Sequence, residues 1–236
     1  MCGIAGYFGT KNISISKIKK TLNLMKNRGP DFQSYYRKKV KKKNIFLLHS
    51  RLSIIDLKNK KANQPYVYKN LALIFNGEIY NYVELKNILK KNNYDFETTS
   101  DTEVLIKFYD FKGLKAFDYF EGMWSIAIFD LAKSELLLSR DRFGEKPLYF
   151  KKERNGFYFA SETKFIQSLH NQKLTPDLDK VNESTKYITN SIVNTFASNK
   201  DGKKLIFFAY LITTALPPIK AAVKNPKKSP IMLFVW

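Results

Sequence analysis

The chain has 236 residues, which is the length of one large domain or of one domain with an added fragment. Hydrophobic residues make up 44% of it and aromatic residues 15%, so the chain is neither a disordered tail nor a fibrous protein. One Cys and two His cannot form a disulfide framework or a structural zinc site. The net charge of +20 comes from 35 Lys but only 6 Arg. Because Arg is the residue preferred for bidentate phosphate contacts, we expect no nucleic-acid and no membrane partner.

The two ends of the chain carry no signal for export or membrane insertion. The N-terminus lacks the basic segment and apolar run of a signal peptide. The longest apolar stretch, Leu205 to Leu216, has twelve residues, fewer than the roughly twenty that span a membrane. We therefore expect a cytoplasmic protein.

Strands and helices alternate in the first part of the chain. Ser16 can cap a helix whose apolar residues recur at helical spacing up to Lys26. The segment Ser100 to Glu103 has the pattern of an N-terminal capping box. In chain order, the patterns predict a strand over 2–8, a helix over 16–26, strands over 34–40, 45–50 and 71–75, a helix over 82–91 and a helix after 100.

The next part is rich in short strands. Apolar runs separated by turns predict consecutive antiparallel strands over 123–130, 135–140, 147–151 and 156–160. Ser161 can cap a last helix that ends near Leu169. Many strands in meanders with few helices between them are typical of an α+β fold, in which helices cover layered sheets.

Cys2 is the first candidate for chemistry. Removal of the initiator Met would leave a thiol and a free α-amine on one residue. The α-amine has an ordinary pKa of about 8 and can take the proton of the thiol as an intramolecular general base. The alternative is that Cys2 is an apolar residue that fills space at the start of a strand.

A series of short motifs follows Cys2 in a fixed order. They are Met1–Ile4, Arg28–Asp31, His49–Asp56, Gln64–Pro65, Asn76–Asn81, Ser100–Asp101, Glu121–Met123, Arg140–Tyr149 and Ala160–Glu162. This set resembles the glutamine-hydrolysing domain of glutamine-dependent asparagine synthetases, which are class II amidotransferases. The resemblance covers about residues 2–170. It implies the N-terminal-nucleophile hydrolase fold, a four-layer αββα sandwich of antiparallel sheets.

The resemblance also implies catalytic roles. Cys2 would attack the side-chain amide of glutamine, release ammonia and form a glutamyl thioester, from which water releases glutamate. The Asn76 side-chain amide and the Gly77 backbone N–H would stabilise the oxyanion, and a single such donor contributes about 3–4 kcal/mol. The α-amine supplies the base, so His49 is read as a hydrogen-bonded support and His170 as a surface residue.

The amino-acid end of glutamine needs its own contacts. By resemblance, Arg51 grips the α-carboxylate with two parallel hydrogen bonds, and Glu78 and Asp101 lie near the α-ammonium. Leu52, Ile54 and Ile55 complete the glutamine site. Four of the six Arg of this Lys-rich chain fall inside the motifs, which favours a geometric role for Arg51 over a surface ion pair. We expect no metal site.

The motifs end well before the chain does. We expect an amidotransferase domain over 2–183 and an atypical basic and apolar tail over 184–236, either truncated or read out of frame. The phosphate loop of an asparagine synthetase, Ser-Gly-Gly-x-Asp-Ser, is missing, so ATP and magnesium belong only to the absent synthetase domain. The glutaminase half needs no cofactor. Expected partners are glutamine, a separate synthetase chain and a second copy of this chain.

The function favoured by the motifs is that of the glutaminase part of an asparagine synthetase. In that enzyme the ammonia is used for ATP-dependent amidation of aspartate to asparagine. The alternative is a catalytically silent module that binds glutamine or a partner and was left by loss of the synthetase domain. A third reading, an anion- or membrane-surface binder driven by the charge of +20, predicts binding with steep salt dependence.

Overall fold

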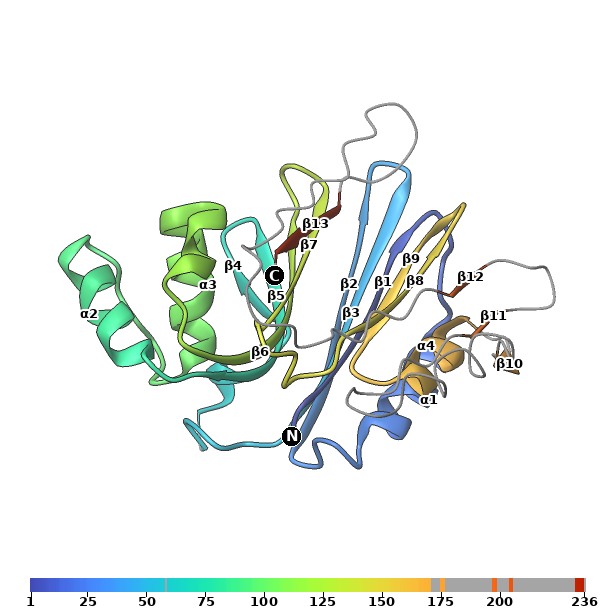
Figure 1. The fold of residues 1–236 in the computed structure, drawn as a ribbon, viewed down its shortest axis with the longest axis horizontal. Coiled ribbons are helices and arrows are strands. Elements are labelled where there is room, and N and C mark those ends of the chain that lie inside the picture. The colour runs from blue at the N-terminus through green and yellow to red at the C-terminus, as the bar shows by residue number, and fades with distance from the viewer. Residues whose placement is uncertain (58, 171–174, 177–196, 199–203, 206–231, 236) are drawn as a thin grey trace, which may run out of the picture.

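The computed structural model describes residues 1–57, 59–170, 175–176, 197–198, 204–205 and 232–235. The predicted domain boundary at 183 and most of the predicted tail over 184–236 lie outside the described residues, so both stay predictions. Within the described part, two five-stranded sheets lie face to face, with helices outside each of them (Figure 1).

The first sheet is built around the N-terminal strand. Its order is β2-β3-β1-β9-β8, and every neighbouring pair is antiparallel. All seven residues of β1 are buried, because strands flank it on both edges and packed layers cover both faces. The strands are β1 (Gly3–Gly9), β2 (Phe32–Val40), β3 (Lys43–Arg51), β8 (Tyr149–Glu153) and β9 (Gly156–Ala160).

The second sheet has the order β13-β7-β6-β5-β4. Its strands are β4 (Tyr66–Tyr68), β5 (Leu71–Ile79), β6 (Gly122–Asp130), β7 (Glu135–Arg140) and β13 (Met232–Val235). The pair β6–β7 is antiparallel as predicted, and the pairs β4–β5 and β5–β6 are antiparallel too, but β13 runs parallel to β7 at the edge. The strands predicted over 135–140 and 147–151 as consecutive antiparallel neighbours are β7 and β8, which lie in different sheets. A small antiparallel sheet holds β10 (Thr175–Pro176), β11 (Ala197–Ser198) and β12 (Lys204–Leu205).

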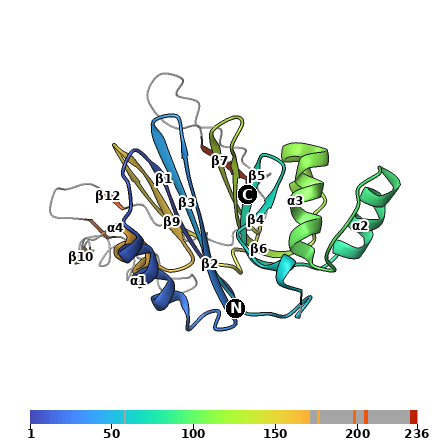
Figure 2. The ribbon, with the colours of Figure 1, turned by 180° about the vertical axis from the view of Figure 1, so that it is seen from behind.

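The helices form the two outer layers, which completes the predicted four-layer αββα sandwich. Figures 1 and 2 show α1 and α4 on the outer side of the first sheet, and α3 on the outer side of the second with α2 beyond it. The helices are α1 (Ile15–Met25), α2 (Tyr82–Lys91), α3 (Asp101–Lys112) and α4 (Thr163–His170), with 3-10 turns η1 (Lys60–Ala62) and η2 (Gly113–Asp118). No helix in the described part of the chain is long and apolar enough to cross a membrane.

Alternating side chains bind these layers together. On β1, Ile4 and Phe8 belong to the core between the sheets, whereas Ala5 and Tyr7 pack under α1 and α4. A third apolar cluster lies between the second sheet and the α2–α3 pair. Apolar clusters therefore cover both faces of each large sheet.

Three local predictions were wrong. The cap of α1 is Ser14, whose side chain accepts a hydrogen bond from Lys17 N, and not Ser16. Ser100 caps α3 as predicted, but Glu103 accepts from the backbone N–H groups of Glu97 and Thr98, so no reciprocal capping box forms. The strand predicted to end at residue 75 continues to Ile79, because its pairing with β6 runs on past the Asn-Gly turn signal.

Phe129 tests the core between the sheets. Its ring is fully buried and meets Phe8 edge-on with ring centroids 5.0 Å apart. We expect Phe129→Ala to lower the free energy of unfolding by about 3–5 kcal/mol in urea denaturation, because the cavity opens between two sheets that cannot collapse onto it. Leu114→Ala, at an exposed position of η2, is the control and should cost less than about 0.5 kcal/mol. Equal losses in the two variants would contradict this packing.

Candidate active site

Cys2 lies immediately before the central strand β1. The antiparallel pairing of Gly3 with Ser50 places it beside the end of β3, where Leu52 N donates to Cys2 Sγ at 3.4 Å. The sulfur is also 3.5 Å from Leu52 O. Burial raises the pKa of the Cys2 thiol above its usual value, while the Leu52 N–H lowers it. The thiol therefore stays protonated near neutral pH unless a base takes its proton.

One pocket collects the residues that the sequence assigned to the site. All nine predicted catalytic and glutamine-binding residues line it, namely Cys2, Arg51, Leu52, Ile54, Ile55, Asn76, Gly77, Glu78 and Asp101. They come from four separate segments of the chain: the start of β1, the end of β3 with its following loop, the end of β5 and the start of α3. Six further residues line the same pocket and were not predicted: Met1, Gln64, Phe75, Ser100, Thr102 and Lys146.

Asn76 and Gly77 lie inside β5, opposite Ser125 and Trp124 of β6. Asn76 is buried, yet its Nδ2 has no hydrogen-bond partner among the described residues. A buried donor without a partner costs free energy, so this amide is set to meet an acceptor that enters the pocket. A side chain at position 77 would collide with the backbone of Met123 and Trp124, which requires Gly there.

Arg51 is buried and already holds the loop that follows it. Its Nη2 donates to the carbonyls of Ile55 and Asp56 at 2.8 and 2.9 Å, and Nη1 donates to Asn63 Oδ1 at 2.7 Å. Both hydrogens of Nη2 are thus engaged in hydrogen bonds. A guanidinium can offer two parallel N–H groups to a carboxylate either from Nη1 and Nη2 or from Nε and Nη2, so both arrangements need a hydrogen of Nη2. The two parallel bonds predicted toward a carboxylate therefore require one loop carbonyl to give way.

Asp101 is the buried acid of the pocket. Its carboxylate accepts from Ile79 N at 3.2 Å and lies 3.4 Å from Ser100 Oγ. Burial raises the pKa of Asp101 to about 6, the Ile79 and Thr102 N–H groups oppose this, and the nearby Glu78 raises it further. A cation between Asp101 and Glu78 would favour both charged forms, so the pair forms a suitable site for an ammonium group.

Arg28, His49 and His170 do not line the pocket. Arg28 Nε donates to Cys2 O at 2.9 Å and Nη1 pairs with Glu162 at 3.0 Å, which fixes the first turn of the chain. Burial lowers the pKa of His49 to about 3, so its ring is neutral at physiological pH. His170 was predicted at the surface and is instead buried, edge-on to Tyr158 and bonded to Glu153.

Two of the residues missed by sequence reasoning, Lys146 and Gln64, belong to motifs without an assigned role. Lys146 is buried, and its Nζ lies 3.5 Å from Met1 Sδ at the mouth of the pocket. Gln64 is buried and links β5 to α3: its Oε1 accepts from Phe75 N at 2.6 Å, and its Nε2 donates to Thr102 Oγ1 at 3.1 Å. Both residues stand in quoted motifs, Gly144–Tyr149 and Gln64–Pro65, and that membership was the available signal.

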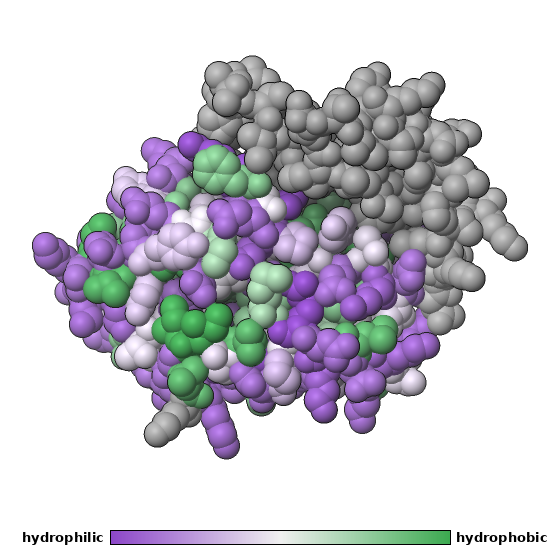
Figure 3. All heavy atoms as spheres, turned by 60° about the horizontal axis from the view of Figure 1, so that its bottom comes forward, coloured by the Kyte–Doolittle hydropathy of each residue, from purple (hydrophilic) through white to green (hydrophobic). Residues whose placement is uncertain are grey.

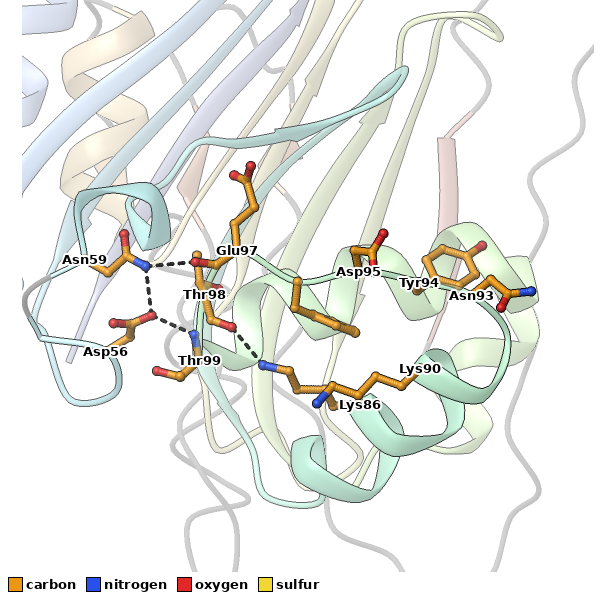
Figure 4. Close-up of a pocket in the computed structure, with 11 residues that line it drawn as sticks. Asp56, Asn59, Lys86, Lys90, Asn93, Tyr94, Asp95, Glu97, Thr98 and Thr99 are labelled. Carbon is orange, nitrogen blue, oxygen red and sulfur yellow. Dashed lines mark hydrogen bonds between the residues drawn. The ribbon is translucent and has the colours of Figure 1, made fainter.

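A second hollow lies next to this pocket. It is an open groove of about 800 Å³ between α2 and the segment 93–99 (Figure 4). None of the nine predicted residues lines it. Its lining comprises Asp56, Asn59, Lys86, Lys90, Asn93, Tyr94, Asp95, Phe96, Glu97, Thr98 and Thr99. Across the described residues, no cluster of three or more His, Cys, Asp or Glu is arranged to hold a metal ion.

Comparison with known proteins confirms the resemblance seen in the motifs. Residues 1–205 match the glutamine amidotransferase domain family. The chain is 39% identical over 184 residues to a putative glutamine-hydrolysing asparagine synthetase of Methanocaldococcus jannaschii, covering 70% of this chain and 35% of that protein. It is 39% identical over 175 residues to asparagine synthetase 2 of Bacillus subtilis, covering 71% and 22%. Asparagine synthetase B of Escherichia coli is 38% identical over 171 residues, covering 70% and 30%.

Solved structures with low sequence identity share the fold. An allosteric regulatory enzyme of purine biosynthesis superposes with a TM-score of 0.61 at 19% identity, over 72% of this chain and 43% of that one. The glutamine phosphoribosylpyrophosphate amidotransferase of B. subtilis gives 0.57 at 18% identity, over 89% and 50%. The N-terminal-nucleophile hydrolase fold is thereby confirmed. The chain spans about a fifth to a third of the length of the asparagine synthetases that it matches.

The raised pKa of Asp101 predicts a specific pH dependence of stability. Because the folded-state pKa of about 6 lies above the ordinary 3.8, the folded protein binds the proton more tightly, and Asp101 destabilises it increasingly as the pH rises through this range. Relative to the wild type, Asp101→Asn should therefore gain up to about 3 kcal/mol of unfolding free energy between pH 4 and pH 7.

Urea denaturation of both proteins at several pH values measures this difference. Asp118→Asn, at an exposed position of η2, is the charge-matched control. A difference between wild type and Asp101→Asn that does not change with pH would contradict a buried, proton-binding Asp101.

Proposed function

This chain belongs to the glutamine amidotransferase family, and on that premise we propose that it hydrolyses glutamine to glutamate and ammonia with Cys2 as the nucleophile. One observation carries the proposal. Nine residues from four separate segments, chosen from sequence motifs, surround a single pocket that holds the Cys2 sulfur. A conserved-looking motif can serve the fold alone, but this convergence is what a reaction centre requires.

The reaction begins at the amine and sulfur of Cys2. Once Met1 is removed, the α-amine takes the thiol proton and the sulfur attacks the carboxamide carbon, forming a C–S bond and an oxyanion. The C–N bond then breaks, and the leaving nitrogen takes the proton from the amine and departs as ammonia. Water attacks the resulting thioester, the C–S bond breaks, glutamate leaves and the thiol regains its proton.

The pocket supports each of these steps. Burial raises the pKa of the thiol, so a base is needed, and the neutral His49 with a pKa of about 3 is too weak to serve. The unpartnered Asn76 Nδ2 and the Gly77 N–H would donate to the oxyanion. Arg51 would meet the α-carboxylate, while Glu78 and Asp101 would meet the α-ammonium.

The ammonia needs an acceptor that this domain does not provide. The relatives are asparagine synthetases of three to five times the matched length, so we assign the product to ATP-dependent amidation of aspartate by a synthetase domain or a separate synthetase chain. ATP and magnesium would bind there. We place the protein in the cytoplasm, where a free thiol stays reduced.

The surface around the pocket mouth suits a protein partner. Ile54 lines the pocket and is 58% exposed, and Leu57 on the same loop is 66% exposed. Tyr80 and Phe143, close in sequence to the pocket residues Glu78 and Lys146, are 58% and 63% exposed. Figure 3 shows hydrophobic side chains gathered on a face of this molecule between polar ones. Exposed apolar side chains such as Ile54 and Leu57 on the loop that lines the pocket are candidates for contact with a partner.

The hydrogen bonds of Arg51 favour a second candidate function. Because both Nη2 hydrogens are held by loop carbonyls, the carboxylate grip is not preformed in this structure. The domain would then bind glutamine without turnover until a partner seated on the exposed Ile54 and Leu57 reshapes the loop.

Cys2→Ala separates these candidates. Under the proposal, the purified wild-type chain releases ammonia from glutamine, and Cys2→Ala abolishes release because no nucleophile remains, as measured in a coupled ammonia assay. Calorimetry should still detect binding of glutamine to Cys2→Ala, which would show that the pocket of the variant is intact. Hydrolysis by Cys2→Ala at the wild-type rate would refute the nucleophile assignment. Glutamine binding by the wild type without any ammonia release would support the second candidate.

A further inference from the structure

Asp56 does not line the glutamine pocket, but it contacts the chain at two places beside it: at Arg51 and just before Asp101. It lies in the loop between β3 and η1, directly after the segment that carries Leu52, Ile54 and Ile55, and its backbone is left-handed with a φ of 55°. Asp is one of the few residues that tolerate this conformation. Its main chain contacts the pocket from one side, and its side chain contacts the neighbouring groove.

The first contact runs to Arg51. Asp56 O accepts a hydrogen bond from Arg51 Nη2 at 2.9 Å. The Ile55 carbonyl accepts from the same nitrogen at 2.8 Å, so when it gives way to a carboxylate, the bond to Asp56 O is the one that still holds Nη2. The position of Asp56 therefore sets the position of the group that would hold the α-carboxylate.

The second contact runs to the start of α3. Asp56 Oδ2 accepts from Thr99 N at 2.8 Å and from Asn59 Nδ2 at 3.5 Å, and Figure 4 shows this carboxylate between the two at one end of the groove. Thr99 directly precedes Ser100, the cap of α3, and Asp101. The carboxylate thus holds the backbone that carries the buried acid facing the α-ammonium.

We propose that Asp56 is a positioning residue that fixes the spacing between Arg51 and Asp101, and so tunes the pocket to a free α-amino acid. The inference rests on the proposed function. Asp56 touches neither the reacting amide nor Cys2 in the described structure; it acts through its bonds to Arg51 and to Thr99.

The role predicts an effect on substrate affinity and not on the chemical step. Hydrogen bonds to charged groups are strong, and Asp56→Asn keeps the shape and the tolerance of a positive φ while it removes the charge. We expect Asp56→Asn to raise KM for glutamine about ten-fold and to change kcat by less than about two-fold. A merely structural role would lower the amount of active protein, and so kcat, at unchanged KM.

Asp95→Asn is the matched control, because Asp95 is exposed, lines the same groove and carries the same charge. It should leave both constants unchanged. An unchanged KM in Asp56→Asn, or a loss of kcat alone, would overturn the role of Asp56. If Asp56→Asn fails to fold, Asn59→Ala decides instead. It withdraws the weaker bond to the same carboxylate, together with the bonds of Asn59 to Glu97 O and Lys61 N. KM should then rise two- to three-fold, whereas an unchanged KM would refute the proposal.

Direct binding distinguishes failure of this inference from failure of the proposed function. Calorimetry of glutamine with Cys2→Ala and with the double variant Cys2→Ala/Asp56→Asn should show about ten-fold weaker binding by the double variant. Equal affinities would overturn the inference even if Cys2 is the nucleophile. Hydrolysis by Cys2→Ala would refute the proposed function. The comparison of glutamine affinities would still test the role of Asp56, because it does not depend on hydrolysis.

Discussion

The pairing of the N-terminal strand inside its sheet determines where the chemistry lies. β1 has β3 on one side and β9 on the other, and its pairing with β3 begins at Gly3 opposite Ser50. Cys2 therefore cannot move away from the end of β3, and the chain terminus emerges within a pocket. A slip of one residue would turn every β1 side chain to the opposite face of the sheet, so the core between the sheets enforces the same register that places the sulfur.

Burial shapes the electrostatics of the pocket. It raises the pKa of the Cys2 thiol, which keeps the thiol protonated, and it raises the pKa of Asp101 to about 6, so this carboxylate takes up a proton more readily than an exposed one. An amino acid brings an ammonium and a carboxylate, and the first would favour ionised Asp101 and Glu78. Under the proposed function, the charges of the substrate would complement those of the pocket, which would favour a free amino acid over a simple amide.

The sequence predicted the architecture better than the local details. Short apolar runs bounded by turns identified nearly all strands of the two large sheets, since a strand that is buried on both faces is apolar along its length. The cap of α1 was misplaced because Ser14 and Ser16 both precede the apolar repeat, and the choice between them depends on packing against the first sheet. The turn expected at Asn76 was overridden by pairing with β6, which no short window of sequence can reveal.

The candidate site was likewise predicted in its residues but not in its detailed geometry. The motifs named nine residues of the pocket, but their convergence comes from sheet register and could not be derived from spacing. The bonds of Arg51 to carbonyls four and five residues later depend on a left-handed Asp56, and neither feature follows from residue type. Lys146 was missed because Lys is so frequent in this chain that its presence in a motif carried little information.

The central claim is that the sulfur and the α-amine of Cys2 act together after Met1 has been removed. Labelling the full chain with a glutamine analogue that bears an electrophilic ketone in place of the carboxamide tests it directly, with intact-mass and peptide analysis as the readout. We expect one adduct per chain, on Cys2, and only in molecules that have lost Met1. Equal labelling of molecules that keep Met1, or labelling at any other residue, would contradict it.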